Sequence, residues 1–276
     1  MNRQKRIIAI NDISCFGKCS LSVALPILSL SGVETCVMPT AVLSTHTAFP
    51  NYNFCDLTAE LSKTAEHWKE LNLNFDAIYT GYLGSKEQVS AVEKIIDMFP
   101  TEFVLVDPVM GDNGKLYDGF GMDFVAEMKK LLKRADIIVP NVTEASYLCD
   151  IPYEHGTHSE EYIMNLCEKL REMCHGKIVI TGINSGEKSV GTAVLDGNEF
   201  HIIEREKYDV FYSGTGDVFA STLASCYLLN RDIVKCATIS ADFVTDCILE
   251  TKRTSGDRNY GINFEPCMKK LLDYLK

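Results

Sequence analysis

The sequence predicts an α/β fold with a mainly parallel central sheet. Short runs rich in apolar and β-branched residues alternate along the chain with longer amphipathic stretches. Parallel strands that are buried on both faces are nearly continuous apolar runs, and they are joined by helices that cover the sheet. Hydrophobic residues make up 46% of the 276 residues, which is enough to fill such a core.

Six short runs are predicted strands because each is apolar, β-branched and bounded by polar or turn-forming residues. The longer stretches between them are predicted helices. In one of these, Ile163, Leu166, Cys167 and Leu170 recur at helical spacing with charged residues between them. In chain order the strands are Arg6–Ile10, Thr35–Met38, Ala77–Thr80, Phe103–Val106, Ile137–Val139 and Lys177–Thr181, and the helices include Ser85–Met98, Asp123–Leu132 and Glu160–Cys174.

A β-hairpin is predicted to interrupt this alternation at residues 186–204. Hydrophobic and polar residues alternate on both sides of Asp196-Gly197-Asn198, which is a typical hairpin turn. The sequence contains no internal repeat, low-complexity tract or linker, so we expect a single domain over residues 1–276. Beyond the hairpin, helices are predicted at Thr215–Leu229, Ile233–Glu250 and Phe264–Leu275.

The formal charge of −11, without basic clusters, argues against nucleic acid or an anionic membrane as a partner. The apolar run Ile7–Ile10 is too short for a signal peptide, and no run approaches the ~20 residues of a membrane span. We therefore expect a soluble, cytoplasmic protein. Of the eleven cysteines only Cys15 and Cys19 are closely spaced, so most thiols are expected to be small buried hydrophobes rather than disulfides or zinc ligands.

The strongest local signal for chemistry is Ser213-Gly214-Thr215-Gly216-Asp217, at the start of a predicted helix. Glycines let backbone N–H groups approach an anion, and a helix N-terminus adds about half a positive charge. Asp217 could then accept a proton from an attacking hydroxyl while the amides hold a phosphoryl group. The structural alternative is that Ser213 or Thr215 caps the helix and Asp217 complements its dipole. From this segment alone the two interpretations are evenly balanced.

Two other polar segments follow predicted strands. Asp107 and Asp112 flank a Pro/Gly turn and suit Mg²⁺, which takes one or two carboxylates together with phosphate oxygens. An ordinary turn is the favoured interpretation of that segment in isolation. Asn141 and Glu144 can form a capping box at a helix start, or they could face nucleotide phosphates and their metal. The glycine-containing segment Asn113–Phe120 could be a flap over a nucleotide or a plain surface loop.

Taken together, these segments resemble the ribokinase-like superfamily and, within it, the pyridoxal/pyridoxamine kinases. The resemblance covers nearly the whole chain in the same order. The 213–217 turn resembles the superfamily's anion hole and catalytic Asp, and residues 141–144 resemble its N-x-x-E element. Thr80-Gly81-Tyr82-Leu83-Gly84-Ser85 and Asp107-Pro108-Val109-Met110-Gly111 point to the vitamin B6 branch, and the G-Y-L-G-S string is the most discriminating of these.

The resemblance implies a single-domain ribokinase-like α/β/α sandwich. It also implies ATP-dependent phosphorylation of the 5′-hydroxyl of pyridoxal, pyridoxamine or pyridoxine in vitamin B6 salvage, by a homodimer that uses MgATP. Whether a monovalent cation such as K⁺ assists stays open. The implied roles are Asp217 as general base with Gly214, Thr215 and Gly216 as anion hole; Asp107, Asp112, Val139, Asn141, Glu144, Thr181 and Ser213 near the nucleotide, with Asp107, Asp112 and Glu144 near its metal; and Asp12, Ser14, Thr47 and Tyr82 near the acceptor.

One departure from the pattern concerns Asp12. Many vitamin B6 kinases carry a Ser-His pair after the first strand, and an ungapped alignment through Phe16-Gly17 places that serine on Asp12, with Ser14 nearby. Asp-x-Ser is more similar to the hydroxymethylpyrimidine kinases of the same superfamily. A carboxylate there favours a protonated ring nitrogen or an amino group. A hydroxymethylpyrimidine kinase of thiamine synthesis is therefore the competing function. A non-catalytic vitamer-binding protein is a third, against which the intact Asp217 speaks.

Overall fold

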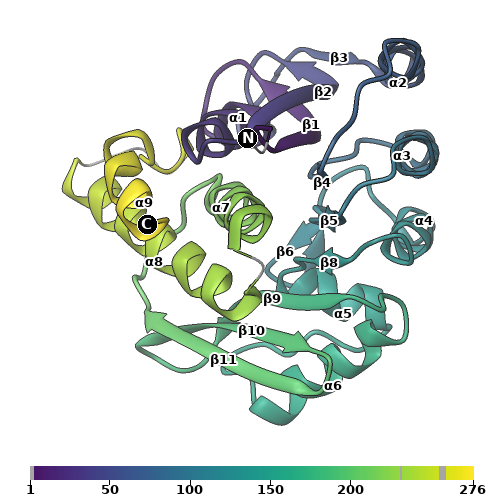
Figure 1. Ribbon diagram of the computed structural model, residues 1–276. Helices are drawn as coiled ribbons and strands as arrows, with labels where there is room; N and C mark the ends of the chain where they lie inside the picture. Colours follow the sequence, from purple (N-terminus) through teal and green to yellow (C-terminus); the bar gives the residue numbers. More distant parts are fainter. Residues whose placement is uncertain (1–2, 231, 255–258) are drawn as a thin grey trace.

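The computed structural model describes residues 3–230, 232–254 and 259–276 (Figure 1). In this part of the chain nine strands form one sheet in the order β11-β10-β9-β8-β5-β4-β1-β2-β3. The six central strands run parallel, and the hairpin β10–β11 and the short β3 add antiparallel edges. The strands are β1 Arg6–Ser14, β2 Glu34–Leu43, β3 Phe54–Asp56, β4 Ala77–Thr80, β5 Phe103–Val106, β8 Ile137–Ile138, β9 Lys177–Asn184, β10 Ser189–Asp196 and β11 Glu199–Glu206.

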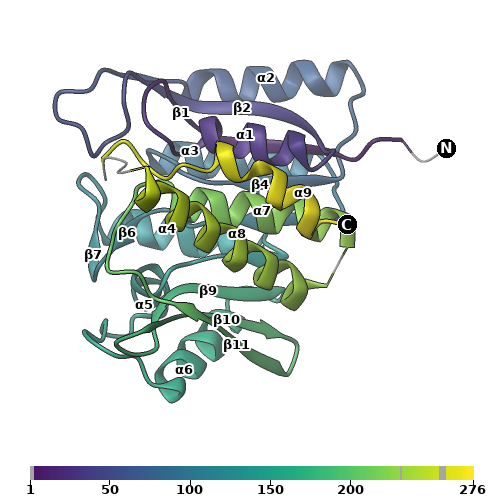
Figure 2. The same cartoon turned by 90° about the vertical axis from the view of Figure 1, so that its left-hand side faces the viewer.

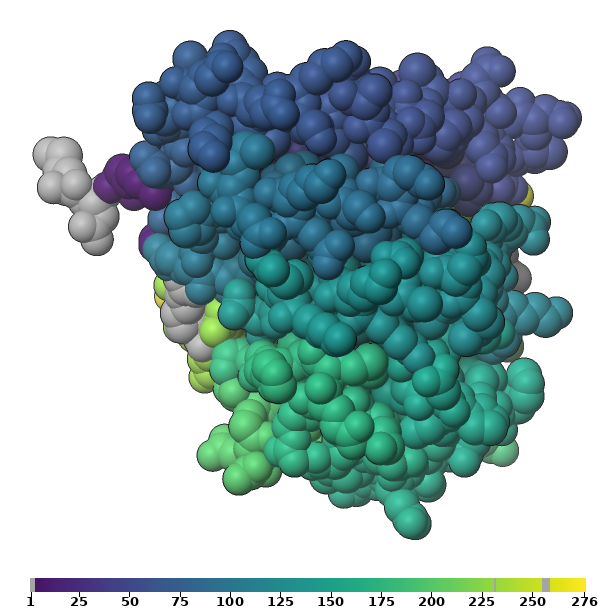
Figure 3. All heavy atoms as spheres, turned by 90° about the vertical axis from the view of Figure 1, so that its right-hand side faces the viewer, coloured from purple at the N-terminus to yellow at the C-terminus, as the bar shows by residue number. Residues whose placement is uncertain are grey.

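Helices cover both faces of this sheet, and each helical layer shares an apolar core with the face beneath it. One layer consists of α2 Thr58–Glu70, α3 Lys86–Met98, α4 Met122–Leu132, α5 Val142–Cys149 and α6 Glu160–Arg171. Figure 3 shows the outer surface of this side, with α2 in blue at the top and α4 in teal below it. The other layer, in front in Figure 2, consists of α1 Leu21–Leu30, α7 Thr215–Asn230, α8 Ile233–Arg253, the 3₁₀ turn Glu265–Cys267 and α9 Met268–Tyr274.

The predicted fold class is confirmed, including the mainly parallel sheet and the hairpin. The predicted strands Ala77–Thr80 and Phe103–Val106 have the observed bounds of β4 and β5. The prediction of one helix over Phe264–Leu275 is wrong in part, because a 3₁₀ turn precedes α9. Helices α1 and α2 and the edge strand β3 were not among the predicted elements.

The topology determines where a site can form. Because β1, β4, β5, β8 and β9 are parallel, the loops after them leave the sheet at one edge, where ligands bind in open α/β sheets. A small hairpin, β6 Gly111–Asp112 with β7 Lys115–Leu116, rises from the loop after β5. The start of α7 lies at the same edge. Within the described ranges, no helix combines the length and the apolar character needed to cross a bilayer.

Candidate active site

The start of α7 has an uncapped set of backbone amides. The carbonyl of Gly214 accepts the first hydrogen bond of the helix, from the Val218 amide at 3.0 Å, so Gly214 occupies the cap position, with φ +85°. A glycine cannot cap the first-turn N–H groups with a side chain, and these groups have no partner within the helix. The Thr215 hydroxyl donates to the Tyr212 carbonyl at 3.4 Å instead of capping. The alternative in which Ser213 or Thr215 caps the helix is therefore wrong.

The 213–217 turn packs tightly against the loop after β1 and the segment before α9. A Cβ atom on Gly214 would lie 2.0 Å from the Lys18 carbonyl oxygen, so only glycine fits this approach. The Lys18 amide donates to the Tyr260 carbonyl at 2.9 Å, and the Ile262 amide donates to the Ser213 carbonyl at 3.1 Å. These contacts hold the turn between the loop after β1 and the segment before α9. Above Gly216 there is no such neighbour, since no heavy atom lies within 4 Å of the position of an added Cβ.

Asp217 is partly exposed in the first turn of α7 and points toward β1. Its Oδ1 accepts a hydrogen bond from the Asn11 side-chain amide at 3.4 Å. Burial raises the pKa of Asp217 to about 6, and the negative charge of Asp12 adds to this rise, although hydrogen bonds from the Ser20 backbone amide and from Asn11 oppose it. A carboxylate with a pKa just below neutrality is suited to accept a proton in catalysis. Asp217 therefore engages β1 and α1, and it does not cap its own helix.

Asp12 lies next to Asp217 at the carboxyl end of β1 and is almost fully buried. The Ser14 hydroxyl donates to its Oδ2 at 3.0 Å. Burial raises the pKa of Asp12, while hydrogen bonds from Ser20 and Ser14 lower it. The neighbouring Cys19 has a pKa raised to about 12, first by burial and then by the charges of Asp217 and Asp12, so its thiol stays protonated. The structure thus brings the predicted acceptor residues Asp12 and Ser14 beside the predicted base.

Tyr82 reaches the same site from the loop after β4. Burial raises the pKa of its hydroxyl to about 12, and the charge of Asp12 contributes, which places the phenol near that carboxylate. The Tyr82 ring packs against Phe120, with ring centroids 5.8 Å apart. A polar group on an aromatic ring beside a buried carboxylate can bind a flat heteroaromatic acceptor by stacking and hydrogen bonding.

Thr47 is exposed in the loop after β2, next to the buried His46. The His46 Nδ1 accepts a hydrogen bond from the Ala48 amide at 3.3 Å, so Nε2 carries the proton and donates to the Asn259 carbonyl at 2.6 Å. His46 therefore ties the loop that carries Thr47 to the segment before α9.

Asp107 and Glu144, two residues predicted to lie near the nucleotide, form a buried pair of carboxyl groups. Burial raises the pKa of Asp107 well above its usual range, and the charges of Glu144 and Asp217 add to this. Burial also raises the pKa of Glu144 to about 8. Among the described residues no three His, Cys, Asp or Glu side chains are arranged to hold a metal. Mg²⁺ needs only one or two carboxylates when phosphate oxygens complete its shell, so these buried carboxyl groups, which would ionise beside a cation, fit a phosphate-bound Mg²⁺.

The predicted capping box at the start of α5 is confirmed. The Asn141 Oδ1 accepts from the Glu144 amide at 3.0 Å, and the Glu144 Oε2 accepts from the Asn141 amide at 2.9 Å. The other oxygen of Glu144 accepts from the Met110 amide at 3.0 Å, and the Asn141 side chain donates to the Gly111 carbonyl at 2.8 Å. Both side chains therefore hold the loop after β5 in place, and their polar atoms are largely occupied by backbone groups.

The segment Asn113–Phe120 is not a free loop, because its first residues close the β6–β7 hairpin and are tied to α5. The Gly114 amide donates to the Thr143 hydroxyl at 2.9 Å, and the Tyr147 hydroxyl donates to the Gly114 carbonyl at 3.3 Å. Tyr117 follows this hairpin, its amide donates to the Met110 carbonyl at 2.9 Å, and its side chain is 43% exposed.

Of the remaining predicted residues, Thr181 and Asp112 lie at the site and Val139 lies in the core. Thr181 lies at the carboxyl edge, where its amide donates to the Pro140 carbonyl at 2.9 Å beside Asn141. The Asp112 carboxyl accepts from the Asn113 amide at 2.8 Å, and burial raises its pKa. Val139 differs, because its side chain is buried in the core beneath α1 and α7 and offers little surface to a nucleotide.

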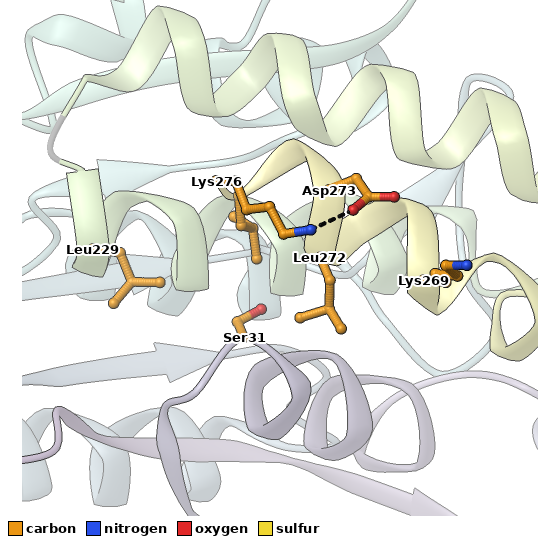
Figure 4. Close-up of a pocket in the computed structure, with 7 residues that line it drawn as sticks. Ser31, Leu229, Lys269, Leu272, Asp273 and Lys276 are labelled. Atoms are coloured by element: carbon orange, nitrogen blue, oxygen red, sulfur yellow. Dashed lines mark hydrogen bonds and ion pairs between the residues drawn. The ribbon is translucent and has the colours of Figure 1, made fainter.

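A pocket of about 430 Å³ lies elsewhere, between the ends of α1 and α7 and the helix α9 (Figure 4). It is bordered by Ser31, Leu229, Lys269, Leu272, Asp273, Leu275 and Lys276. Lys276 is paired with Asp273 at 2.7 Å. None of the candidate residues described above lines this pocket. Ser31 follows the carboxyl end of α1, next to the edge of the sheet where β1 and β2 begin. The candidate site residues therefore lie at the carboxyl edge of the sheet, and this pocket is separate from them.

Comparison with known proteins gives matches over most of the chain. The family model for phosphomethylpyrimidine kinase matches residues 37–262. A pyridoxal kinase of Dictyostelium discoideum is 27% identical over 240 residues, which cover 80% of this chain and 77% of the relative. A hydroxymethylpyrimidine/phosphomethylpyrimidine kinase of Aquifex aeolicus is 27% identical over 176 residues, covering 63% of this chain and 67% of the relative.

Solved structures agree with this. A Bacteroides thetaiotaomicron protein classed with the phosphomethylpyrimidine kinases, determined with pyridoxal, has a TM-score of 0.90 and 34% identity, with 99% of this chain and 96% of that chain covered. The pyridoxal kinase of Lactobacillus plantarum has a TM-score of 0.91 and 28% identity, with 99% and 98% covered.

Proposed function

Since this chain belongs to the phosphomethylpyrimidine kinase family and has the ribokinase-like fold of the pyridoxal kinases, we propose that it phosphorylates a vitamin B6 vitamer in vitamin B6 salvage. The enzyme is an ATP-dependent small-molecule kinase. The observation that carries the proposal is the pairing of Asp217 with the uncapped amides of α7, beside the buried Asp12 and the half-buried Tyr82. A kinase that relies on positioning and electrostatics needs these parts and little else.

The chemistry proceeds from the acceptor side. Asp217 accepts the proton of the 5′-hydroxyl of pyridoxal, pyridoxamine or pyridoxine as that oxygen attacks the γ-phosphorus of ATP, and the bond from this phosphorus to the bridging oxygen breaks, which releases ADP. The backbone amides of Gly214, Thr215 and Gly216 hold the transferring phosphoryl group and stabilise the charge that develops on its oxygens. Gly216 provides the close approach, because no heavy atom lies within 4 Å of its missing side chain. Asp12, Ser14, Thr47 and Tyr82 orient the ring so that the hydroxyl faces Asp217.

The nucleotide side is formed by the loops after β5, β8 and β9. Mg²⁺ bound to ATP neutralises phosphate charge, and we assign Asp107 and Asp112 to its shell, with Glu144 behind them. Because Glu144 and Asn141 bond backbone amides around Gly111, their contribution is to hold these carboxylates in position. Thr181 and Ser213 border the nucleotide. Val139 contributes through the core rather than by contact.

A second candidate acceptor, hydroxymethylpyrimidine, is favoured by one observation. The buried Asp12 carboxyl has hydrogen bonds from two serines and stands where a carboxylate would bind an amino group or a protonated ring nitrogen. An aminopyrimidine offers such a group beside its ring nitrogen. Pyridoxal remains the leading acceptor because the phenol of Tyr82 and the G-Y-L-G-S loop suit the B6 branch, and a relative of 34% identity was determined with pyridoxal.

A direct competition assay separates the two acceptors. The purified protein is given MgATP with pyridoxal, pyridoxamine, pyridoxine or hydroxymethylpyrimidine, and the phosphorylated products are quantified by mass spectrometry. We expect kcat/KM for at least one B6 vitamer to exceed that for the pyrimidine. Efficient turnover of the pyrimidine alone would assign the enzyme to thiamine synthesis, and binding of all four without turnover would identify a vitamer-binding protein.

We also propose a cytoplasmic homodimer in which residues 1–276 act as one kinase domain. The family model spans residues 37–262, which supports one kinase domain, and the net charge of −11 argues against an anionic membrane as a partner. Light scattering of the purified protein tests the dimer. Titration of KCl against a sodium background tests whether a monovalent cation assists.

A further inference from the structure

We propose that Asn11 is a positioning residue that sets the distance between the base Asp217 and the acceptor loop that carries Tyr82. This inference rests on the proposed function and adds to it a residue with no contact to the phosphates. Asn11 is 1% exposed and lies at the carboxyl end of β1. The parallel register between β1 and β2 shifts between Asn11 and Ile13, and such irregularities redirect side chains at active sites.

The side chain of Asn11 connects three segments of the chain. Its Oδ1 accepts hydrogen bonds from the backbone amides of Tyr82 at 2.8 Å and of Asp12 at 2.9 Å. Two N–H donors on that atom identify it as the oxygen, so the side-chain NH₂ group faces Asp217, whose Oδ1 lies 3.4 Å away. A single carboxamide thereby fixes the base relative to two acceptor residues.

Gly81 provides the space for this arrangement. A Cβ atom on Gly81 would lie 2.1 Å from Nδ2 of Asn11 and 2.5 Å from its Cγ, a contact that no side chain tolerates. The glycine of the G-Y-L-G-S string therefore serves the carboxamide of Asn11, while Gly84 of the same string meets only ordinary contacts of 3.5 Å or more. The pair Asn11 and Gly81 is one structural unit formed by neighbouring strands.

The chemistry requires an amide at this position. Aspartate would keep the acceptor oxygen for the Tyr82 and Asp12 amides but would place a negative charge against Asp217. Alanine would remove both contacts. In phosphoryl transfer a displacement of about 1 Å between base and hydroxyl can cost about 100-fold in rate without weakening ground-state binding. The expected signature is therefore a loss in kcat with little change in KM.

The test compares Asn11→Asp, Asn11→Ala and Gly81→Ala with the wild type on whichever alcohol the wild type turns over. We expect kcat to fall about 100-fold for Asn11→Asp and about 10-fold or more for the other two. The KM for the alcohol and the Kd for ADP should stay close to wild-type values. The melting temperature should fall in all three variants, because each removes buried hydrogen bonds or adds a steric or charge conflict. Gly84→Ala is the matched control in the same loop, with kcat expected within about twofold of wild type.

Two results would overturn the inference: kcat within about threefold of wild type for a folded Asn11→Asp enzyme, or losses in KM and ADP affinity that equal the loss in kcat. If Asn11→Asp does not fold, Asn11→Ala and Gly81→Ala decide in the same way. A wild type inactive on every alcohol would refute the proposed function separately. In that case, crystal structures of wild type and Asn11→Ala decide. A changed separation between the Asp217 carboxyl and the Tyr82 amide supports the inference, and an unchanged one refutes it.

Discussion

Asp12 and Asp217 come from opposite ends of the chain, and Ser20 binds both of them. The Ser20 hydroxyl hydrogen-bonds the carboxyl of Asp12, and its backbone amide hydrogen-bonds that of Asp217. Ser20 adopts a positive φ of 55° immediately before α1, a conformation that few non-glycine residues adopt. The charge of Asp12 is close enough to raise the pKa of Asp217. The acidity of the base thus depends on the acceptor side of the site.

The pH dependence of catalysis follows from this pair. Because Asp217 must be deprotonated to act as a base and has a pKa of about 6, kcat/KM should fall as pH decreases below about 6. Replacing Asp12 by Asn removes a neighbouring negative charge, so the pKa of Asp217 falls and the acidic limb moves to lower pH. The profile of log kcat/KM from about pH 5 to about pH 9 measures this shift. An acidic limb that stays in place in Asp12→Asn would show that the two carboxyl groups are not coupled.

Asp217→Asn should make the ligand-free protein more stable. The folded-state pKa of about 6 lies above the ordinary value of 3.8, so the native state binds the proton more tightly and loses stability as pH rises through 6. Above that pH the ionised group costs about 2–3 kcal/mol, which asparagine avoids. We expect an increase in melting temperature of about 5 °C at neutral pH that vanishes below about pH 4. Equal melting temperatures at neutral pH would contradict the claim that the ionised Asp217 destabilises the fold.

Gly214→Ala should cost more than the same change at a comparable glycine. Gly214 and Gly156 both have left-handed backbones, with φ of +85° and +90°, so the backbone penalty is matched. Only Gly214 meets a backbone oxygen, that of Lys18, at 2.0 Å from the added Cβ. We expect Gly156→Ala to lose about 1 kcal/mol of stability and keep its activity, and Gly214→Ala to lose at least twice as much and most of its kcat. Urea unfolding and initial rates measure both. Equal losses of stability in the two variants would contradict the claim that the Lys18 carbonyl excludes any side chain at position 214.

Substitutions of Asp107 and Glu144 should have different effects, because Asp107 is assigned to Mg²⁺ binding and Glu144 to holding the loop after β5 in place. Asp107→Asn relieves the repulsion from Glu144 and should leave stability unchanged or improved, while the Mg²⁺ concentration for half-maximal activity rises about tenfold or more. Glu144→Gln leaves the amides of Met110, Gly111 and Asn141 short of an acceptor and should cost about 1–3 kcal/mol with a smaller effect on Mg²⁺. Mg²⁺ titrations and thermal melts measure the two effects. The reverse pattern would exchange the assigned roles.

Much of the fold could be predicted because its strands are short apolar runs with clear boundaries, such as β4 and β5. Helix α1 gave no amphipathic signal because it is apolar almost all round and contains Pro26. Helix α2 is mostly polar and buries only Leu61 and Ala65, so its apolar stripe is weak. Strand β3 has three exposed residues, and its pairing with β2 is determined by tertiary contacts.

The site was predictable where one segment contains the chemistry, as in the 213–217 turn and the capping box at Asn141. Asn11 and Ser20 were not, because each interacts with Asp217, which lies about 200 residues further along the chain. The carboxamide of Asn11 has meaning only when β1, the loop after β4 and α7 are side by side. Val139 was placed at the nucleotide by resemblance, whereas its burial assigns it to the core.

The most direct test of the central claim is the initial rate of ATP-dependent formation of pyridoxal 5′-phosphate by the wild type and by Asp217→Asn, with the Kd for ADP measured on both. We predict that the wild type forms the product in proportion to enzyme, and that Asp217→Asn retains ADP binding within about threefold while kcat falls about 10³-fold or more. Near-equal rates would contradict Asp217 as the base. The absence of product from the folded, ADP-binding wild type would contradict the assignment of this chain as a vitamin B6 kinase.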